Sequence, residues 1–280
     1  VIIKGKSLPD ANAPNDLENV KNVVRAFIHS PGMKVENIPG FQKSAPIDFD
    51  DALKELVPEE LVPEAYLDSE NPSVEAMEGA IDSLIRETVG FLIMRGFEQG
   101  SPFKEEVKEL SVVPKRFAFI PVTEIFDVES GDFHSAEKEL DDGKLPLVSC
   151  GELENGLVGL YAAPEPSLIH RNAFTVAYNG QPLNTNFHPY EFLAKDDVAV
   201  CVPKAGVSLE TAIVAAASLN IEKWRYSYAR KCFREKFTGT KIPMPVDENG
   251  NLDVGLMKAL VQGNPYWKYL AAHLEKASSS

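Results

Sequence analysis

Apolar positions in the first third of the chain recur with the period of an α-helix. Over residues 71–95 they fall three and four residues apart, which places them on one side of a helix. Pro72 suits the first helical position and Gly96 suits the end of a helix. The pattern therefore predicts a long amphipathic helix over 71–95. A shorter helix is expected over 50–57, where Pro58 ends it.

After residue 115 the pattern changes to short apolar runs separated by turn residues, which is typical of β-strands. The predicted strands cover 117–122, 145–149, 157–163, 173–178 and 198–203. An alanine-rich helix capped by Ser208 follows, then a second helix over 221–237 and two short helices over 254–261 and 265–276. We therefore expect an α+β fold with an acidic helical N-terminal region over 1–115, a mixed α/β domain over 116–249 and a short helical tail over 250–280. The N-terminal region is a candidate surface for a partner.

Composition is that of a globular protein, with 44% hydrophobic and 25% charged residues. No apolar run approaches the 18 residues of a membrane span, and the N-terminus lacks the apolar segment of a signal peptide. The three cysteines, Cys150, Cys201 and Cys232, form no CxxC pair, which excludes a zinc ribbon. Their odd number argues against a secreted disulfide framework, so we expect buried or free thiols and a cytoplasmic location.

The formal charge of −14 argues against nucleic-acid binding by the chain as a whole, because phosphate contacts need Lys and Arg. One segment differs from the rest. Residues 205–245 hold seven Lys and Arg against three Glu, a local charge of +4, while the remainder carries −18. An acidic body with one basic strip is compatible with weak DNA binding that a basic partner strengthens.

Six short sequence phrases follow one another in a fixed order. They are KLPLVS at 144–149, NGLVGLY at 155–161, FTVAYNG at 174–180, VAVCVP at 198–203, YSYARK at 226–231 and KIPMPV at 241–246. In order and spacing they resemble the target-recognition domains of type I restriction–modification specificity (S) subunits and the specificity domains of related adenine-N6 methyltransferases. The resemblance covers residues 117–249, slightly under half of the chain.

The resemblance implies a DNA target-recognition domain and a non-catalytic specificity subunit of a restriction–modification system. Such a subunit directs an adenine-N6 methyltransferase, and a nuclease where one is present, to a DNA target. Double-stranded DNA and the methyltransferase subunit would be its partners. S-adenosylmethionine is expected on the methyltransferase, and no cofactor is expected in this chain.

Candidate base-reading residues lie in two segments. Asn and Gln side chains can bond adenine bidentately in the major groove, and the segment 179–188 is rich in such groups. In the resembling domains the strand end near 149–155 also presents polar groups to DNA. The candidates are Ser149, Asn155, Asn179, Gln181, Asn184, Thr185, Asn186 and His188. The same residue types also make ordinary turns, which is the competing interpretation.

Candidate phosphate contacts lie on the basic strip, because Lys, Arg, Tyr and Thr donors fix the register of a protein on DNA. They are Arg225, Tyr226, Arg230, Lys231, Arg234, Lys236, Thr238 and Lys241. The competing interpretation is a solvated helix face with its aromatic side chains in the core. The closing phrase KIPMPV is expected to be structural, because its two prolines favour an extended chain.

Motifs of common enzymes are absent from the sequence. The stretch NPYW at 264–267 lacks the second proline of the adenine-N6 methyltransferase motif, and no G-x-G-x-x-G, P-loop or H-E-x-x-H motif occurs. The five histidines are scattered without metal-ligand spacing. We therefore expect neither a catalytic nor a metal site.

Alternatives remain open at this point. A half-size specificity subunit that works as a homodimer, a separate subunit for one methyltransferase, and a piece of a fused enzyme all fit the sequence. From other functional classes, an acidic anti-restriction decoy would occupy the methyltransferase without DNA, and a small-molecule enzyme would use an α/β fold. A steep salt dependence of duplex binding would separate a DNA reader from a decoy.

Overall fold

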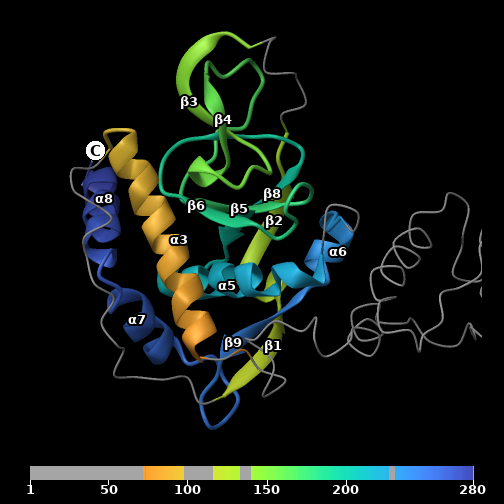
Figure 1. Ribbon diagram of the computed structural model, residues 1–280, viewed down its shortest axis with the longest axis vertical. Helices are drawn as coiled ribbons and strands as arrows, with labels where there is room; N and C mark the ends of the chain where they lie inside the picture. Colours follow the sequence, from red (N-terminus) through yellow and green to blue (C-terminus); the bar gives the residue numbers. More distant parts are fainter. Residues whose placement is uncertain (1–71, 73, 98–115, 133–139, 227–230, 280) are drawn as a thin grey trace, which may run out of the picture. The chain divides into compact units, whose positions relative to one another are not determined.

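A four-stranded antiparallel sheet forms the centre of the fold (Figure 1). The computed structural model describes residues 72, 74–97, 116–132, 140–226 and 231–279, and the helix expected over 50–57 lies outside them. The strand order is β2 (Phe126–Ser130), β8 (Val198–Pro203), β5 (Ala173–Ala177) and β6 (Thr185–His188). Every residue of β5 and β6 is buried. The described residues thus confirm a fold of mixed helices and strands.

Two smaller sheets flank the central one. The first has the order β4 (Leu157–Tyr161), β3 (Asp142–Val148) and β7 (Leu193–Ala194), with β3 antiparallel to β4 and parallel to β7. The second pairs β1 (Phe117–Pro121) with β9 (Lys241–Pro245), and the short helix α4 (Val122–Ile125) leads from β1 to β2. All five predicted strands are therefore present, with ends that differ by a few residues.

Strand β9 is the structural form of the KIPMPV phrase, which the sequence predicts to be extended. The N–H of Val246 donates to the carbonyl of Arg116, so alternate residues of β9 turn their N–H groups toward β1. Pro243 and Pro245 have the opposite parity and lie on the unpaired edge. A proline lacks an N–H group and costs no hydrogen bond at such an edge. The structural role expected for this phrase is confirmed.

Helix α3 (Val74–Met94) is the long helix that the sequence predicts, and it begins three residues later than expected. Its apolar stripe, which includes Met77, Ile81 and Val89, is buried. Gly96 has a φ of +73° beyond its end, and the N–H of Phe97 returns to the carbonyl of Leu92 at 2.8 Å. Helix α3 and the central sheet share one apolar core, so this helix is packed against the strand region.

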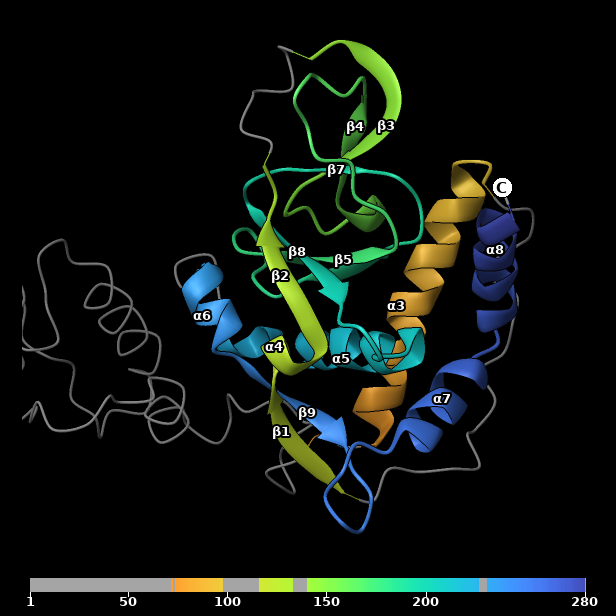
Figure 2. The same ribbon diagram turned by 180° about the vertical axis from the view of Figure 1, so that it is seen from behind.

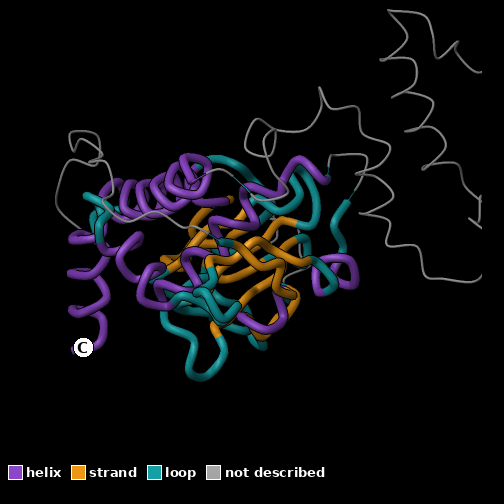
Figure 3. Tube along the Cα trace, turned by 90° about the horizontal axis from the view of Figure 1, so that it is seen from below, coloured by secondary structure: helices purple, strands orange, loops and turns teal. Residues whose placement is uncertain are grey.

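Helix α5 (Leu209–Ile221) packs against α3, β6 and β9, and α3 crosses it (Figures 1 and 2). Its predicted cap is confirmed, since the Ser208 hydroxyl accepts the N–H of Thr211 at 3.2 Å. The sequence predicts burial of one face only, whereas residues 211–219 are all buried. The alanines at 215–217 carry one methyl group each, so neighbouring elements can approach α5 on every side. Figure 3 shows helices on both sides of the strands.

The two tail helices, α7 (Val254–Gln262) and α8 (Trp267–Ser279), are also as predicted. Leu260 and Leu270 are buried in the core, and Asn264 Nδ2 donates to Asp82 Oδ1 of α3 at 3.0 Å. Figures 1 and 2 both show α8 beside α3. The apolar faces of these helices are therefore used within the chain, and this gives no support to a homodimer formed through them. None of the described helices is long and apolar enough to cross a membrane.

Two expectations about secondary structure are wrong. The segment 179–188 is not a loop throughout, because its last four residues form β6. The helix expected over 221–237 is broken: a 3-10 turn, η6 (Glu222–Arg225), ends at the extended residue Tyr226, and α6 (Arg234–Thr238) begins later. Residues 227–230 lie outside the described part. Because of this break, the basic side chains do not lie along the surface of one continuous helix, contrary to what the sequence predicts.

Candidate nucleic-acid interface

Three of the predicted segments meet at one end of the central sheet. The turn after β3 reaches the β5–β6 turn, where Asn184 Nδ2 donates to the carbonyl of Gly151 at 3.3 Å. The basic strip, which we call the basic segment from here on (residues 223–241), contacts the same turn at two points. Lys223 Nζ donates to Asn184 Oδ1 at 2.5 Å, and the N–H of Cys232 donates to the carbonyl of Tyr178 at 3.2 Å. Residues separated by more than 80 positions in the sequence thus surround one turn.

The β5–β6 turn is held tightly at its base. The N–H of Ala177 donates to the carbonyl of Asn184 at 2.9 Å. Gly180 has a φ of +61°, and a Cβ there would lie 3.2 Å from the carbonyl oxygen of Cys150, so glycine fits best. Gln181 is exposed at the tip, and Asn179 is half-buried. Of the amide side chains predicted to read bases, Gln181 is the one with most access to solvent.

Five predicted base-reading residues are buried instead. The exposed fractions are 4% for Asn155, 8% for Asn184, 1% for Thr185, 2% for Asn186 and 0% for His188. A side chain with so little exposed surface does not reach a base edge unless the fold opens. These five expectations are therefore corrected: the residues belong to the interior that supports the turn.

His188 is the centre of this interior network. Its Nε2 lies 2.7 Å from the Thr175 hydroxyl, and its Nδ1 lies 2.8 Å from the Tyr190 hydroxyl. Complete burial lowers the pKa of the imidazole to about 3, so His188 is neutral at physiological pH. Asn155 Nδ2 donates to the carbonyl of Phe187 at 2.8 Å and to the Tyr190 hydroxyl at 2.9 Å. The network ties the turn after β3 to the end of β6.

The half-buried groups of the site are largely committed to one another. The Ser149 hydroxyl donates to Asp197 Oδ2 at 2.7 Å, which leaves it poorly placed for DNA. Burial lowers the pKa of Lys223, while the carboxylates of Glu87 and Glu152 oppose that effect. Asn184 is 8% exposed and is held by Lys223. We interpret the Asn184–Lys223 pair as the floor of the site.

The basic segment divides into buried and exposed members. Arg225 is buried in an ion pair with Glu222, and the buried Tyr226 hydroxyl lies 3.4 Å from the Thr240 hydroxyl. Neither side chain is available to phosphate, which corrects both expectations. Arg230 lies outside the described residues. Thr238 is partly buried, and its hydroxyl donates to the carbonyl of Glu235 at 3.1 Å.

Four cations of the basic segment remain exposed: Lys231, Arg234, Lys236 and Lys241. Arg234 also donates from Nη2 to the carbonyl of Val128 at 3.0 Å, which fixes its position beside β2. We call these four residues together with Gln181 the candidate interface. Its chemistry is that of phosphate contact by the cations and base contact by one amide.

Among the described residues, no three His, Cys, Asp or Glu side chains gather as a metal site. The cysteines are free thiols, as the sequence predicts, with Cys201 and Cys232 buried and Cys150 half-buried. Burial, with Asp197 nearby, raises the pKa of the Cys150 thiol. The thiol is therefore protonated at physiological pH.

No protein-family model matches the chain, and no curated protein is similar to it in sequence. In solved structures, the chain is similar to the S subunit of a type I restriction–modification system from M. genitalium, with 15% identity and a TM-score of 0.42 over 82% of this chain and 54% of that one. It is also similar to the HsdS subunit from Thermoanaerobacter tengcongensis, with 12% identity and a TM-score of 0.40 over 82% and 50%. A third chain comes from a structure that describes the assembly of a type I restriction–modification system, with 11% identity and a TM-score of 0.42 over 74% and 52%. The chain thus spans about half the length of each of these proteins.

Proposed function

We propose that the chain is a DNA sequence-specificity subunit of a restriction–modification system. In this role it positions an adenine-N6 methyltransferase on its target and performs no chemistry itself. The observation that carries the proposal is the convergence of the segments around 149–155, 179–186 and 223–236. Each of these segments overlaps at least one of the sequence phrases that resemble target-recognition domains.

The charge distribution supports the same proposal. The chain has a formal charge of −14, yet Lys231, Arg234, Lys236 and Lys241 are exposed within a short stretch. Exposed cations contact phosphates without regard to sequence, and Gln181 supplies an amide that can discriminate bases. The methyltransferase would bring S-adenosylmethionine and most of the remaining backbone contacts.

An adenine-methylation map of the native host tests the proposal. We expect methylation at one defined motif to disappear when the gene is deleted and to return with the wild-type gene. A gene that carries Lys231→Glu and Arg234→Glu should not restore it. Lys258→Glu is the matched control, because Lys258 is exposed on α7 and has no part in the candidate interface. A methylation map that is identical with and without the gene would contradict the proposal.

Duplex binding separates this function from the acidic decoy. A specificity subunit with its methyltransferase should bind duplex DNA, with an affinity that falls steeply with salt. A decoy should bind the methyltransferase and lower its DNA affinity. The exposed cations of the candidate interface favour the DNA reader over the decoy.

A further inference from the structure

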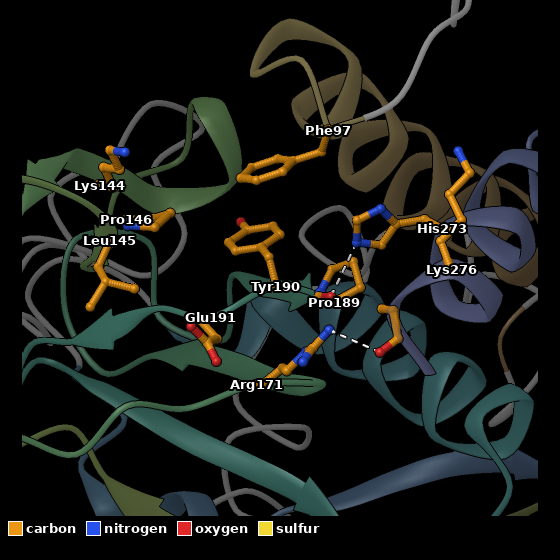
Figure 4. Close-up of a pocket in the computed structure, with 11 residues that line it drawn as sticks. Phe97, Lys144, Leu145, Pro146, Arg171, Pro189, Tyr190, Glu191, His273 and Lys276 are labelled. Atoms are coloured by element: carbon orange, nitrogen blue, oxygen red, sulfur yellow. Dashed lines mark hydrogen bonds between the residues drawn. The ribbon is translucent and has the colours of Figure 1, made fainter. Parts of the chain in front are cut away.

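A pocket of about 600 Å³ lies at the far end of the β5–β6 hairpin from the candidate interface (Figure 4). In this hairpin Ala173 pairs with His188 at one end, and Val176 pairs with Thr185 at the other. The pocket residues Arg171 and Pro189 flank the first pair, whereas the turn with Gln181 follows the second. The pocket is therefore a separate site, and the candidate interface does not account for it.

One wall of the pocket is aromatic and rigidly placed. The Tyr190 hydroxyl is held by Asn155 and His188 at 2.9 and 2.8 Å, so the ring has a fixed orientation. Phe97 stacks on Tyr190 with ring centroids 5.8 Å apart and an interplanar angle of 5°. Figure 4 shows the two rings one above the other. Phe97 is 43% exposed. Tyr190 is 5% exposed and its ring also stacks on Phe91 at a centroid distance of 4.9 Å, so Phe97 supplies the exposed aromatic surface on which a planar ring can stack.

Cations from three parts of the fold surround this wall. Lys144 comes from β3, Arg171 precedes β5, and Lys276 comes from α8, while Glu191 is the one carboxylate among the lining residues. Arg171 Nη2 donates to the carbonyl of Ala277 at 3.5 Å, which places its guanidinium at the pocket edge. In a chain of formal charge −14 this is a local reversal of sign. A cationic surface of this kind favours an anionic ligand.

We propose that this pocket binds a nucleoside phosphate, with its base on Phe97 and its phosphate near Arg171. Arginine recognises phosphate through paired N–H donors, and aromatic side chains stack with any base. The volume lies within the range of roughly 300–1,000 Å³ that small-molecule sites occupy. An acidic peptide would use the cations but would not need the stacked aromatic wall, so the pair of features favours a nucleotide.

The proposal goes beyond sequence recognition by the candidate interface and does not depend on it. A free nucleotide and a nucleotide unit at the end of a single strand share the chemistry of base and phosphate. Adenosine 5′-monophosphate and a short 5′-phosphorylated single-stranded oligonucleotide are therefore the two probes. Inorganic phosphate and adenosine test the two halves of the ligand separately.

Titration calorimetry of the full chain with adenosine 5′-monophosphate is the decisive experiment. We expect a dissociation constant below about 1 mM for the wild type. Arg171→Gln should weaken binding about tenfold, because it removes a charge-assisted contact. Lys144→Gln should weaken binding less, because Lys144 lies across the pocket from Arg171 (Figure 4). Phe97→Leu should weaken the nucleotide and adenosine while it leaves inorganic phosphate unaffected. Lys258→Gln, distant from the pocket on α7, is the matched control and should bind as the wild type does.

The outcomes separate this site from the candidate interface. Lys231→Glu with Arg234→Glu should leave nucleotide binding unchanged, and Arg171→Gln should leave duplex binding unchanged. Displacement of the nucleotide by the oligonucleotide, lost in the same pocket variants, would assign the ligand to a strand end, and its failure would assign it to a free nucleotide. The proposal is overturned if the nucleotide does not bind with a dissociation constant below about 1 mM, if Arg171→Gln and Phe97→Leu bind it as the wild type does, or if Arg171 holds an acidic peptide and no nucleotide.

Discussion

His188 should make the fold sensitive to acid, and its environment sets the size of the effect. The imidazole is completely buried, and burial holds its pKa at about 3, against an ordinary value of 6.5. The Thr175 and Tyr190 hydroxyls and the Asn155 amide contact the ring. A positive charge on His170 would disfavour protonation of His188 further. The folded state therefore keeps His188 neutral at pH values where the unfolded chain binds a proton.

The sign of the effect follows from that difference in proton binding. The folded pKa is lowered, so the contribution to stability is complete above pH 6.5 and is lost as the pH falls toward 3. Each pH unit in this window is equivalent to about 1.4 kcal/mol for one proton. Between pH 7.5 and pH 4.5 we expect the free energy of unfolding to fall by about 2.5 kcal/mol on account of His188 alone.

Urea unfolding of wild type and His188→Gln at several pH values measures this contribution. The variant is expected to be less stable at every pH, because it loses two buried hydrogen bonds, so the informative quantity is the pH dependence. That dependence should be weaker in the variant by about 2.5 kcal/mol over the stated range. His170→Gln is the matched control: burial lowers the pKa of His170 too, but Asp132 and Glu129 oppose it, so its effect should be smaller. Equal pH dependence in wild type and His188→Gln would refute the reasoning.

Other predictions concern the interface and the core. Lys231→Gln with Arg234→Gln should reduce the slope of log affinity against log salt for duplex DNA by about 2, and an unchanged slope would remove both from the phosphate contacts. Asn184→Leu should lower the free energy of unfolding by about 1–3 kcal/mol, because it leaves the half-buried Lys223 ammonium without its amide partner; stability equal to wild type in urea unfolding would contradict this. Phe187→Ala should cost about 3–5 kcal/mol, since Phe187 is 1% exposed and stacks within the core. An unfolding midpoint equal to wild type would argue against that packing.

The helices and apolar strands could be predicted because local sequence determines them. The apolar stripe of α3 repeats over five turns, and Gly96 marks its end, so no distant contact was needed to recognise it. Strands β5 and β8 are short apolar runs between turn residues. In all these elements the local pattern and the tertiary environment agree.

Strand β6 could not be predicted, because its sequence TNFH is mostly polar. Its burial depends on partners outside the strand: the Thr175 and Tyr190 hydroxyls for His188, and the distant Asn220 for the backbone N–H of Thr185. The broken helix at 222–234 has the same origin. No proline or glycine marks the break, and contacts of the segment with the β5–β6 turn replace helical hydrogen bonds there.

The same reason limits what the sequence says about the site. The sequence identified the segments that converge. It did not distinguish the side chains that face solvent from those that support the turn. Asn186 and Gln181 are similar amides five positions apart, yet one is buried and the other is exposed. Long-range packing decides between them, and a pattern of residue types does not contain that information.

The separation between buried supports and exposed tips has an evolutionary consequence. His188 and Asn155 hold the hairpin from within, so Gln181 can be exchanged with little effect on folding. In such a recognition surface the exposed residues can be substituted by many residue types while the fold that supports them stays the same. Substitutions at the exposed tip should therefore change the recognised sequence without requiring compensating substitutions elsewhere. The same number of substitutions in the buried network around His188 would instead destabilise the fold and be removed by selection.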